Sequence, residues 1–279
     1  MNKYRIIFTL FPIFIFACGA SQDLLPYKKL DKITLYLEAY YPENFNKSEK
    51  NAAIVFFFGG GWQIGDRHHF KNQAKYLSKR GITCFLADYR IKSKHGTTPF
   101  DALKDAKSAI RFLRIHADSI GIDPEKIIAA GGSAGGHLAA ATALINGYNH
   151  QDDDLSISCV PNALILFNPV IDNGPGGYGY EMISDAYLHF SPLHNIRPGA
   201  PPTLFLLGNK DRLVPLETGM YYQKVMERVG SLCELKIYEG GHGFFNYDHF
   251  KNYKKTLEAA DEFLQSLNYL EPEPEIQIK

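Results

Sequence analysis

KIIAAGGSAGGHLAAATALI, residues 126–145, decides the fold because it joins an apolar strand to an apolar helix through a turn of small residues. The first residues suit a buried strand, and the last suit a buried helix. Between them, Gly131, Ser133 and Gly135 satisfy the pattern G-x-S-x-G. A serine on such a turn needs tiny neighbours, because the helix must approach the strand closely and leave the hydroxyl clear. The stretch therefore predicts a strand–turn–helix unit that presents Ser133 as a nucleophile.

Apolar runs and helical patterns alternate on both sides of this unit. Strands are expected at residues 33–42, 52–58, 82–89, 126–132, 163–170, 203–209 and 233–240. Helices are expected at residues 69–80, 100–117, 137–145, 217–229 and 250–267. Such alternation is typical of an α/β fold, a mainly parallel central sheet with helices on both faces. We therefore expect one domain over residues 21–270 and a frayed tail over residues 271–279.

Residues 1–20 have the composition of an export signal. Lys3 and Arg5 precede an apolar run over residues 6–16, which is too short to cross a bilayer, and small residues follow. Cys18 stands where a bacterial lipoprotein carries its acylated cysteine, which predicts cleavage before Cys18 and a lipid anchor to the membrane. Ordinary cleavage after Gly19 or Ala20 and a retained anchor are the alternatives. The sequence thus predicts an exported protein, either periplasmic, an outer-membrane lipoprotein, or secreted.

The charge of the chain disfavours nucleic acid as a partner. Its 279 residues carry 30 basic and 30 acidic side chains, so the formal net charge is zero, and no basic stripe stands out. His68–His69 and residues 152–154 are interpreted as a surface pair and a solvated acidic turn rather than as metal ligands. Neither a metal nor a cofactor is expected.

A serine hydroxyl needs a base at neutral pH, and the base needs an acid to orient it. In a parallel sheet, both are expected on loops that follow later strands, at the same edge as Ser133. Asp211 follows the strand at 203–209, and His242 follows the strand at 233–240. The sequence therefore predicts Ser133, Asp211 and His242 as a catalytic triad, in the chain order of the α/β-hydrolases.

Other residues compete for two of these roles. Glu217 and Glu239 are alternatives for the acid, because they lie close to the same loops. His189 and His194 are alternatives for the base, because they lie in an irregular segment whose course the pattern does not define.

The glycine loop Gly59–Gly60–Gly61 follows the strand at 52–58 and precedes Trp62. Neither a Walker lysine nor dinucleotide spacing accompanies it, so a phosphate site is disfavoured. Ester chemistry instead requires backbone N–H donors for the negative oxygen of a tetrahedral intermediate. One donor is expected from Ala134, directly after the nucleophile, and the others from this loop.

Taken together, these motifs resemble the α/β-hydrolase esterases, in the branch of hormone-sensitive-lipase-like and bacterial feruloyl or acetyl esterases. The resemblance extends over residues 52–245 and rests on GGGW at 59–62, DYR at 88–90, GGSAGGHLA at 131–139, SPL at 191–193, GNKDRLVP at 208–215 and GGHGF at 240–244. It implies that Gly60 and Gly61 join Ala134 in an oxyanion hole.

The resemblance also implies roles for residues outside the triad. Asp88 and Arg90 would brace the fold rather than touch the substrate. Phe58 departs from the pattern, since relatives usually carry a histidine there that steadies the glycine loop through hydrogen bonds. Phe58 would then hold the loop by packing, or leave it looser.

The only sizeable insertion, residues 172–202, predicts a minimal cap and an open site. Aromatic walls for a sugar or aryl group and one polar contact are expected. An equal alternative is that Tyr178 and Tyr180 fold onto their own loop. The expected substrate contacts are Trp62, Asn173, Tyr178, Tyr180 and Phe244.

The combined expectation is an exported serine carboxylesterase that works through an acyl-enzyme. Its expected substrates are short acyl esters, acetyl or feruloyl, on material derived from polysaccharides. A serine peptidase of the prolyl-oligopeptidase type and a non-catalytic surface binding protein are the two alternatives.

Overall fold

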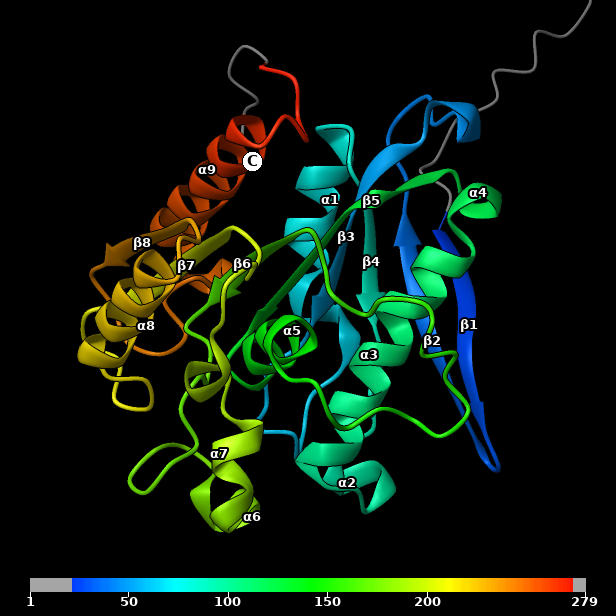
Figure 1. Ribbon diagram of the computed structural model, residues 1–279. Helices are drawn as coiled ribbons and strands as arrows, with labels where there is room; N and C mark the ends of the chain where they lie inside the picture. Colours follow the sequence, from blue (N-terminus) through cyan, green and yellow to red (C-terminus); the bar gives the residue numbers. More distant parts are fainter. Residues whose placement is uncertain (1–21, 273–279) are drawn as a thin grey trace, which may run out of the picture.

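The computed structural model describes residues 22–272, which form one eight-stranded sheet in the order β1-β2-β4-β3-β5-β6-β7-β8 (Figure 1). Within these residues β2 alone runs against the other strands. The strands are β1 (Gln22–Leu30), β2 (Ile33–Tyr40), β3 (Asn51–Phe57), β4 (Thr83–Ala87), β5 (Ile122–Gly132), β6 (Ala163–Phe167), β7 (Thr203–Gly208) and β8 (Cys233–Tyr238).

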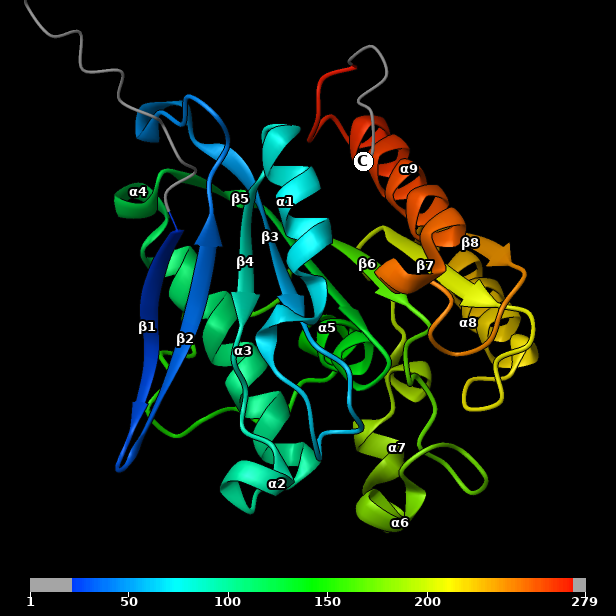
Figure 2. The same cartoon turned by 180° about the vertical axis from the view of Figure 1, so that it is seen from behind.

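Helices cover both faces of this sheet. Figure 1 shows α3, α5 and α8 on one face, and Figure 2 shows α1 and α9 on the other. The helices are α1 (Lys71–Lys79), α2 (Lys92–His95), α3 (Pro99–Ile115), α4 (Ala117–Ile120), α5 (Ala134–Leu144), α6 (Tyr180–Ile183), α7 (Tyr187–Phe190), α8 (Leu216–Arg228) and α9 (Phe250–Ser266). The predicted α/β-hydrolase fold, with a mainly parallel sheet between two helical layers, is confirmed.

Burial explains why the inner strands could be read from apolar runs. Every residue of β4, β6 and β7 is buried, as expected for parallel strands that are covered on both faces. Every residue of α5 is buried as well, so this helix is apolar on all sides and lies inside the molecule.

The pattern of the sequence does not predict β1. Its segment contains Pro26, Lys28 and Lys29, and the pairing with β2 shifts register between Pro26 and Lys28. Edge strands tolerate proline, whose absent N–H then faces no partner, and bulges are most frequent at sheet edges. Lys28 is buried and forms an ion pair of 2.8 Å with Asp105 of α3, so the strand packs despite its polar residues.

The segment between β6 and β7 forms a small cap at the carboxyl edge of the sheet. It contains α6 and α7, which lie together at the bottom of Figure 1. The Asn173 N–H donates to Ser191 Oγ over 2.9 Å, and Asn195 Nδ2 donates to the Ser191 carbonyl over 2.9 Å. The cap is therefore short and tied to itself, as the minimal cap predicted from the sequence requires.

The expected export signal at residues 1–20 and most of the expected tail at 271–279 lie outside the described residues. Among residues 22–272, no helix combines the length and the apolar character needed to cross a membrane.

Candidate active site

Ser133 occupies the turn between β5 and α5 in a backbone conformation that few residues adopt. Its φ is 54° and its ψ is −121°, a region that costs a non-glycine residue about 1–3 kcal/mol. Its N–H donates to the Phe167 carbonyl over 3.0 Å, and its carbonyl accepts from the N–H groups of His137 at 3.0 Å and Val170 at 3.1 Å. These bonds hold the strained turn that projects the hydroxyl from the sheet edge.

The glycines around Ser133 are required by close packing. A Cβ on Gly135 would lie 2.1 Å from the carbonyl oxygen of Phe57, and a Cβ on Gly131 would lie 2.4 Å from the carbonyl oxygen of Gly135. No side chain fits at these distances, so α5 can lie against β3 and β5 only because both positions are glycine.

The Ser133 hydroxyl begins a chain of two hydrogen bonds. It donates to His242 Nε2 over 2.8 Å, and His242 Nδ1–H donates to Asp211 Oδ2 over 2.8 Å. The Asp211 side chain is fully buried, and its Oδ1 accepts from the N–H groups of Leu213 at 2.8 Å and Val214 at 3.0 Å. A carboxylate held in this way fixes the imidazole tautomer whose Nε2 can take the serine proton. The structure thus brings together the three residues expected from the sequence.

The competing acids and bases lie elsewhere. Glu239 is exposed and pairs with Lys210 at 2.8 Å, and Glu217 is exposed on the first turn of α8. His189 is exposed on α7, and His194 lies beside Asp172. Within residues 22–272, none of the four alternatives bonds to the serine or to the imidazole of the triad.

Three backbone N–H groups beside Ser133 suit an anion. Gly60 and Gly61 follow β3 with φ values of 121° and 62°, and a Cβ on Gly60 would lie 2.1 Å from the Ile64 carbonyl oxygen. Ala134 opens α5, where N–H groups have no acceptor inside the helix. In the described part of the chain, none of the three donates to a protein acceptor. Free donors at a helix N-terminus favour negative charge.

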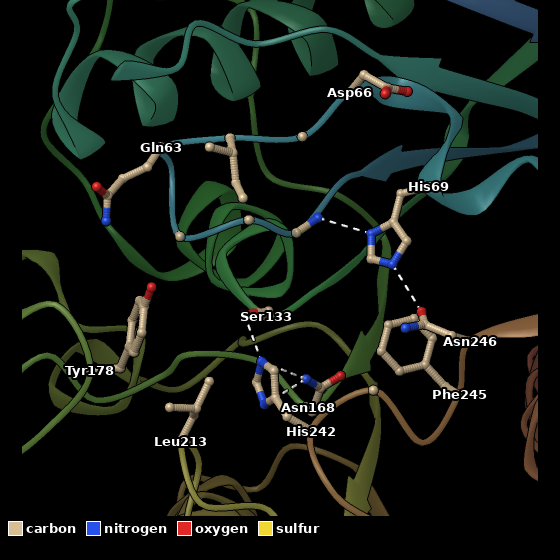
Figure 3. A pocket seen from close by; sticks show the side chains of 16 residues that line it. Gln63, Asp66, His69, Ser133, Asn168, Tyr178, Leu213, His242, Phe245 and Asn246 are labelled. Atoms are coloured by element: carbon tan, nitrogen blue, oxygen red, sulfur yellow. Dashed lines mark hydrogen bonds between the residues drawn. The ribbon is translucent and has the colours of Figure 1, made fainter. Parts of the chain in front are cut away.

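A cavity of about 660 Å³ opens over the hydroxyl. Figure 3 shows Ser133 between the glycine loop and His242, with His69 and Asn246 on one side and Tyr178 and Leu213 on the other. The lining residues are Gly59, Gly60, Gly61, Gln63, Ile64, Gly65, Asp66, His69, Ser133, Asn168, Tyr178, Leu213, His242, Gly243, Phe245 and Asn246. Asp66 is the single carboxylate of this lining, which contains neither lysine nor arginine.

Of the five predicted substrate contacts, only Tyr178 lies in the cavity wall. The prediction for Trp62 is corrected, because its side chain is 1% exposed and its ring packs edge-on against His137 at 5.1 Å. The prediction for Asn173 is corrected as well, because it is fully buried and its Nδ2 donates to the Tyr178 carbonyl over 2.9 Å. Both residues hold the cap in place instead of facing a ligand.

The predictions for Tyr180 and Phe244 as substrate contacts are also corrected. Tyr180 opens α6, outside the cavity lining, and its ring meets Tyr187 edge-on at 6.1 Å. Phe244 is 2% exposed and stacks on Tyr238 at 5.3 Å, whereas its neighbour Phe245 lines the cavity. The turn after His242 therefore places Phe245, and not the predicted Phe244, in the cavity wall.

Asn168, which the sequence analysis passed over, packs against the imidazole of His242. Its amide nitrogen lies 2.9 Å from Nδ1 and 3.0 Å from Nε2. Because Asp211 and Ser133 already use the in-plane positions of both ring nitrogens, this amide lies against the ring and restricts its rotation. A signal existed, since Asn168 is the polar residue that directly follows the apolar strand β6 at the catalytic edge.

His69 is exposed, as the predicted surface pair requires, but it also lines the cavity and bonds to two loops. Its Nδ1 accepts from the Gly59 N–H over 3.0 Å, and its Nε2–H donates to Asn246 Oδ1 over 3.0 Å. Its neighbour His68 lies beside Asp66 and Glu38 and does not line the cavity. Only the three-dimensional structure separates these two adjacent histidines.

Two histidines near Ser133 are held in the neutral form. Burial lowers the pKa of His137 to about 3, and its Nε2–H donates to the Phe190 carbonyl over 2.9 Å. Desolvation by the surrounding protein also lowers the pKa of His69 below its usual value. Neither ring therefore adds a positive charge near the triad at neutral pH.

The remaining residues of the resemblance lie behind the cavity. The ring of Phe58 stacks on Tyr89 with centroids 4.0 Å apart, and the Tyr89 hydroxyl donates to the Phe58 carbonyl over 2.7 Å. Asp88 pairs with Arg67 at 2.9 Å, and Arg90 pairs with Asp105 at 2.7 Å, as residues that brace the fold would.

Comparison with known proteins gives the same class from several directions. A family model described as BD-FAE matches residues 37–175. An acetylxylan esterase of Xylanibacter ruminicola is 31% identical over 246 residues, which cover 82% of this chain and 47% of that protein. The chain spans about half the length of the curated relatives it matches.

Solved structures resemble the whole described fold. Esterase 2 of Thermogutta terrifontis, phosphoramylated by tabun, has a TM-score of 0.87 and 43% identity, covering 90% of this chain and 97% of that chain. The butyrate-bound form of the same enzyme has a TM-score of 0.86 and 42% identity, covering 92% of this chain and 97% of that chain.

Proposed function

We propose that this chain, which belongs to the serine esterases of the α/β-hydrolase fold, hydrolyses short-chain carboxylic esters through an acyl-enzyme. One observation carries the proposal. The hydrogen-bonded series Ser133–His242–Asp211 lies in the same cavity as the glycine loop, whose N–H groups are free to receive an oxyanion.

In the proposed first half-reaction, Ser133 Oγ attacks the ester carbonyl carbon while its proton passes to His242 Nε2. The carbonyl oxygen becomes an oxyanion, which accepts from the N–H groups of Gly60, Gly61 and Ala134. Removal of one such donor typically slows acyl transfer by about 10²–10³-fold. The intermediate then expels the alcohol, which takes the proton from Nε2, and the acyl group remains on Oγ.

In the second half-reaction, water attacks the acyl carbon and gives a proton to His242 Nε2. The new oxyanion occupies the same three donors, and its collapse breaks the bond to Ser133 Oγ. The carboxylic acid leaves as the proton returns to the serine. Asp211 stabilises the imidazolium in both halves and stays ionised.

Two findings support a short acyl group and a carbohydrate alcohol. Butyrate occupies a structure of the Thermogutta terrifontis enzyme, and the Xylanibacter ruminicola relative is described as an acetylxylan esterase. The cavity wall presents Gln63, Asp66 and Asn246, whose amides and carboxylate suit hydroxyl groups of a neutral sugar. A feruloyl ester on the same polysaccharide is the alternative within this class, since the sequence motifs resemble bacterial feruloyl and acetyl esterases.

The test compares turnover of p-nitrophenyl acetate, butyrate and octanoate by the wild type and by Ser133→Ala. Activity should decline with chain length, and the substitution should lower kcat by about 10⁶-fold. Acetate release from acetylated xylan against ferulate release from arabinoxylan then identifies the natural ester. Turnover of prolyl-p-nitroanilide alone would indicate a peptidase, and no turnover of any substrate would indicate a binding protein.

We propose in addition that the protein is exported and lipid-anchored through Cys18. Lys3 and Arg5, the apolar run at 6–16 and the small residues after it support this proposal. Fractionation with radiolabelled palmitate should find the label on the wild type in the membrane fraction. Cys18→Ser should remove the label, and a label that persists would reject the anchor.

A further inference from the structure

His69 joins two loops that come from opposite ends of the described chain. It accepts from the Gly59 N–H over 3.0 Å at Nδ1 and donates to Asn246 Oδ1 over 3.0 Å at Nε2. Gly59 begins the loop of the predicted oxyanion donors, and Asn246 lies four residues after the catalytic base. Figure 3 shows both bonds, one on each side of the ring.

The surroundings of His69 fix the orientation of its ring. The ring lies against Phe70 with centroids 4.7 Å apart and against Phe245 at 5.6 Å. Its short helix, Arg67–Phe70, is anchored because Arg67 pairs with Glu38 of β2 and with Asp88 after β4, each at 2.9 Å. The short helix that carries the imidazole is therefore anchored to the sheet independently of the two bonds that His69 makes to the loops.

Gly59 needs such an acceptor because it lies beyond the end of β3. Phe57 is the last residue of β3 to pair with neighbouring strands. The bond from Tyr89 fixes the carbonyl of Phe58, and the bond to His69 fixes the N–H of Gly59 in the next position. The entry to Gly60 and Gly61 is thus held from both sides.

Asn246 belongs to the same turn as the base. Its N–H donates to the Gly243 carbonyl over 3.0 Å, and its carbonyl accepts from the His249 N–H over 2.9 Å. A displacement of Asn246 would therefore displace the residues next to His242. The neutral imidazole suits both partners at once, since one nitrogen must accept and the other must donate.

We propose that His69 is a positioning residue that holds the oxyanion donors Gly60 and Gly61 at a fixed distance from His242. This inference rests on the proposed ester hydrolysis. His69 stabilises the tetrahedral intermediate indirectly, because the donors stay where the negative oxygen forms and need no rearrangement during the reaction.

Three variants test the link that His69 makes between the glycine loop and the turn after His242. His69→Ala removes both bonds. His69→Gln keeps them, because a carboxamide places an acceptor and a donor on one carbon, as the imidazole does. His68→Ala is the matched control, since His68 lies one residue away, bonds to Asp66 and Glu38 instead, and is absent from the cavity lining.

With p-nitrophenyl acetate, His69→Ala should lower kcat by about 10-fold, the scale of a lost neutral hydrogen bond, with KM within twofold of the wild type. His69→Gln should regain most of kcat, and His68→Ala should match the wild type. An unchanged kcat in His69→Ala overturns the proposal. Equal losses in His69→Ala and His69→Gln also overturn it.

Amide hydrogen exchange separates this inference from the proposed function, because it needs no turnover. His69→Ala should speed exchange in peptides covering residues 59–65 and 242–246, while α5 and β5 keep their protection. Unchanged exchange in both peptides rejects the link even if the enzyme is an esterase. If the wild type turns over no ester but the two peptides respond, the proposed function fails and the link stands.

Discussion

The two oxygens of Asp211 have different partners, which gives a sharp test of its role. Oδ1 accepts from two backbone N–H groups, and Oδ2 accepts from His242 Nδ1–H. In Asp211→Asn, the carbonyl oxygen can keep the backbone bonds, and the new NH₂ then faces Nδ1 and favours the wrong imidazole tautomer. We expect kcat for p-nitrophenyl acetate to fall by about 10⁴-fold with the melting temperature nearly unchanged.

Glu239→Gln is the control for this prediction. Glu239 follows β8 as Asp211 follows β7, but it is exposed and pairs with Lys210. It should therefore keep wild-type kcat. Near-normal activity in Asp211→Asn would contradict the assignment of Asp211 as the acid of the triad.

Phe58 shows how one residue type replaces another at the glycine loop. The sequence allowed either packing or a looser loop at this position, and the structure shows a buried ring stacked on Tyr89. Phe58→His should not raise kcat, because His69 already supplies the imidazole acceptor for Gly59. It should lower stability by about 1–3 kcal/mol in urea unfolding, since the new ring nitrogens would be buried in an apolar stack. A higher kcat would show that the loop lacks a hydrogen bond in the wild type.

Residues that depend on local pattern were predictable, and residues that depend on distant neighbours were not. Ser133 directly follows β5, Asp211 lies three residues after β7, and His242 lies four residues after β8, so the sheet topology brings them to one edge. Trp62 carries a left-handed φ of 59°, and its ring points into the core beneath the cap. No local pattern distinguishes such a ring from one that faces a ligand.

At the scale of elements, one buried ion pair joins α1 to α9. Arg80 donates to Asp261 through Nε over 2.5 Å and Nη2 over 3.0 Å, and both side chains are less than 10% exposed. Asp261→Ala leaves the guanidinium without these bonds and should cost about 3 kcal/mol of unfolding free energy. Glu262→Ala, on the exposed side of the same helix, should cost less than about 0.5 kcal/mol. Equal losses in urea titrations would contradict the burial argument.

The same pair predicts a pH dependence of stability. Burial by itself would raise the pKa of Asp261, but hydrogen bonds from Arg80, Gln265 and Tyr76 outweigh it and hold the pKa below its usual value. A lowered folded-state pKa stabilises the fold above the unfolded pKa of about 3.9 and loses that effect as the pH falls through the folded value. The stability gap between the wild type and Asp261→Ala should therefore be constant from pH 8 to pH 5 and shrink below about pH 4. A gap of unchanged size at pH 2 would exclude this linkage.

Strands and helices with a consistent hydrophobic pattern were predictable, whereas elements with a mixed pattern were not. The inner strands are apolar throughout, and α3 and α9 repeat at the helical period. β1 has neither signal, since Pro26 and two lysines interrupt it and its stability comes from pairing with β2. The first four residues of β5 were missed for a related reason, because Asp123, Pro124 and Glu125 interrupt the apolar pattern and are only partly buried or exposed.

For the whole molecule, the small cap predicts kinetics without activation at a lipid–water interface. Ile64 and Leu213 line the cavity and are 63% and 45% exposed, so the cavity is accessible without movement of the cap. The rate of p-nitrophenyl butyrate hydrolysis should follow a hyperbola in substrate concentration, without a rise at the solubility limit. A sharp rise there would mean that an interface opens the site, as a movable lid would require.

The order of residues along the chain has a consequence for how activity arises. The connection between α5 and β6 divides the catalytic parts, with Gly60, Gly61 and Ser133 before it and Asp211 and His242 after it. Within the sheet, the two parts of the chain meet where β6 pairs with β5. Neither fragment alone has both a nucleophile and a base, so ester cleavage reports the reassembly of two inert halves into one sheet.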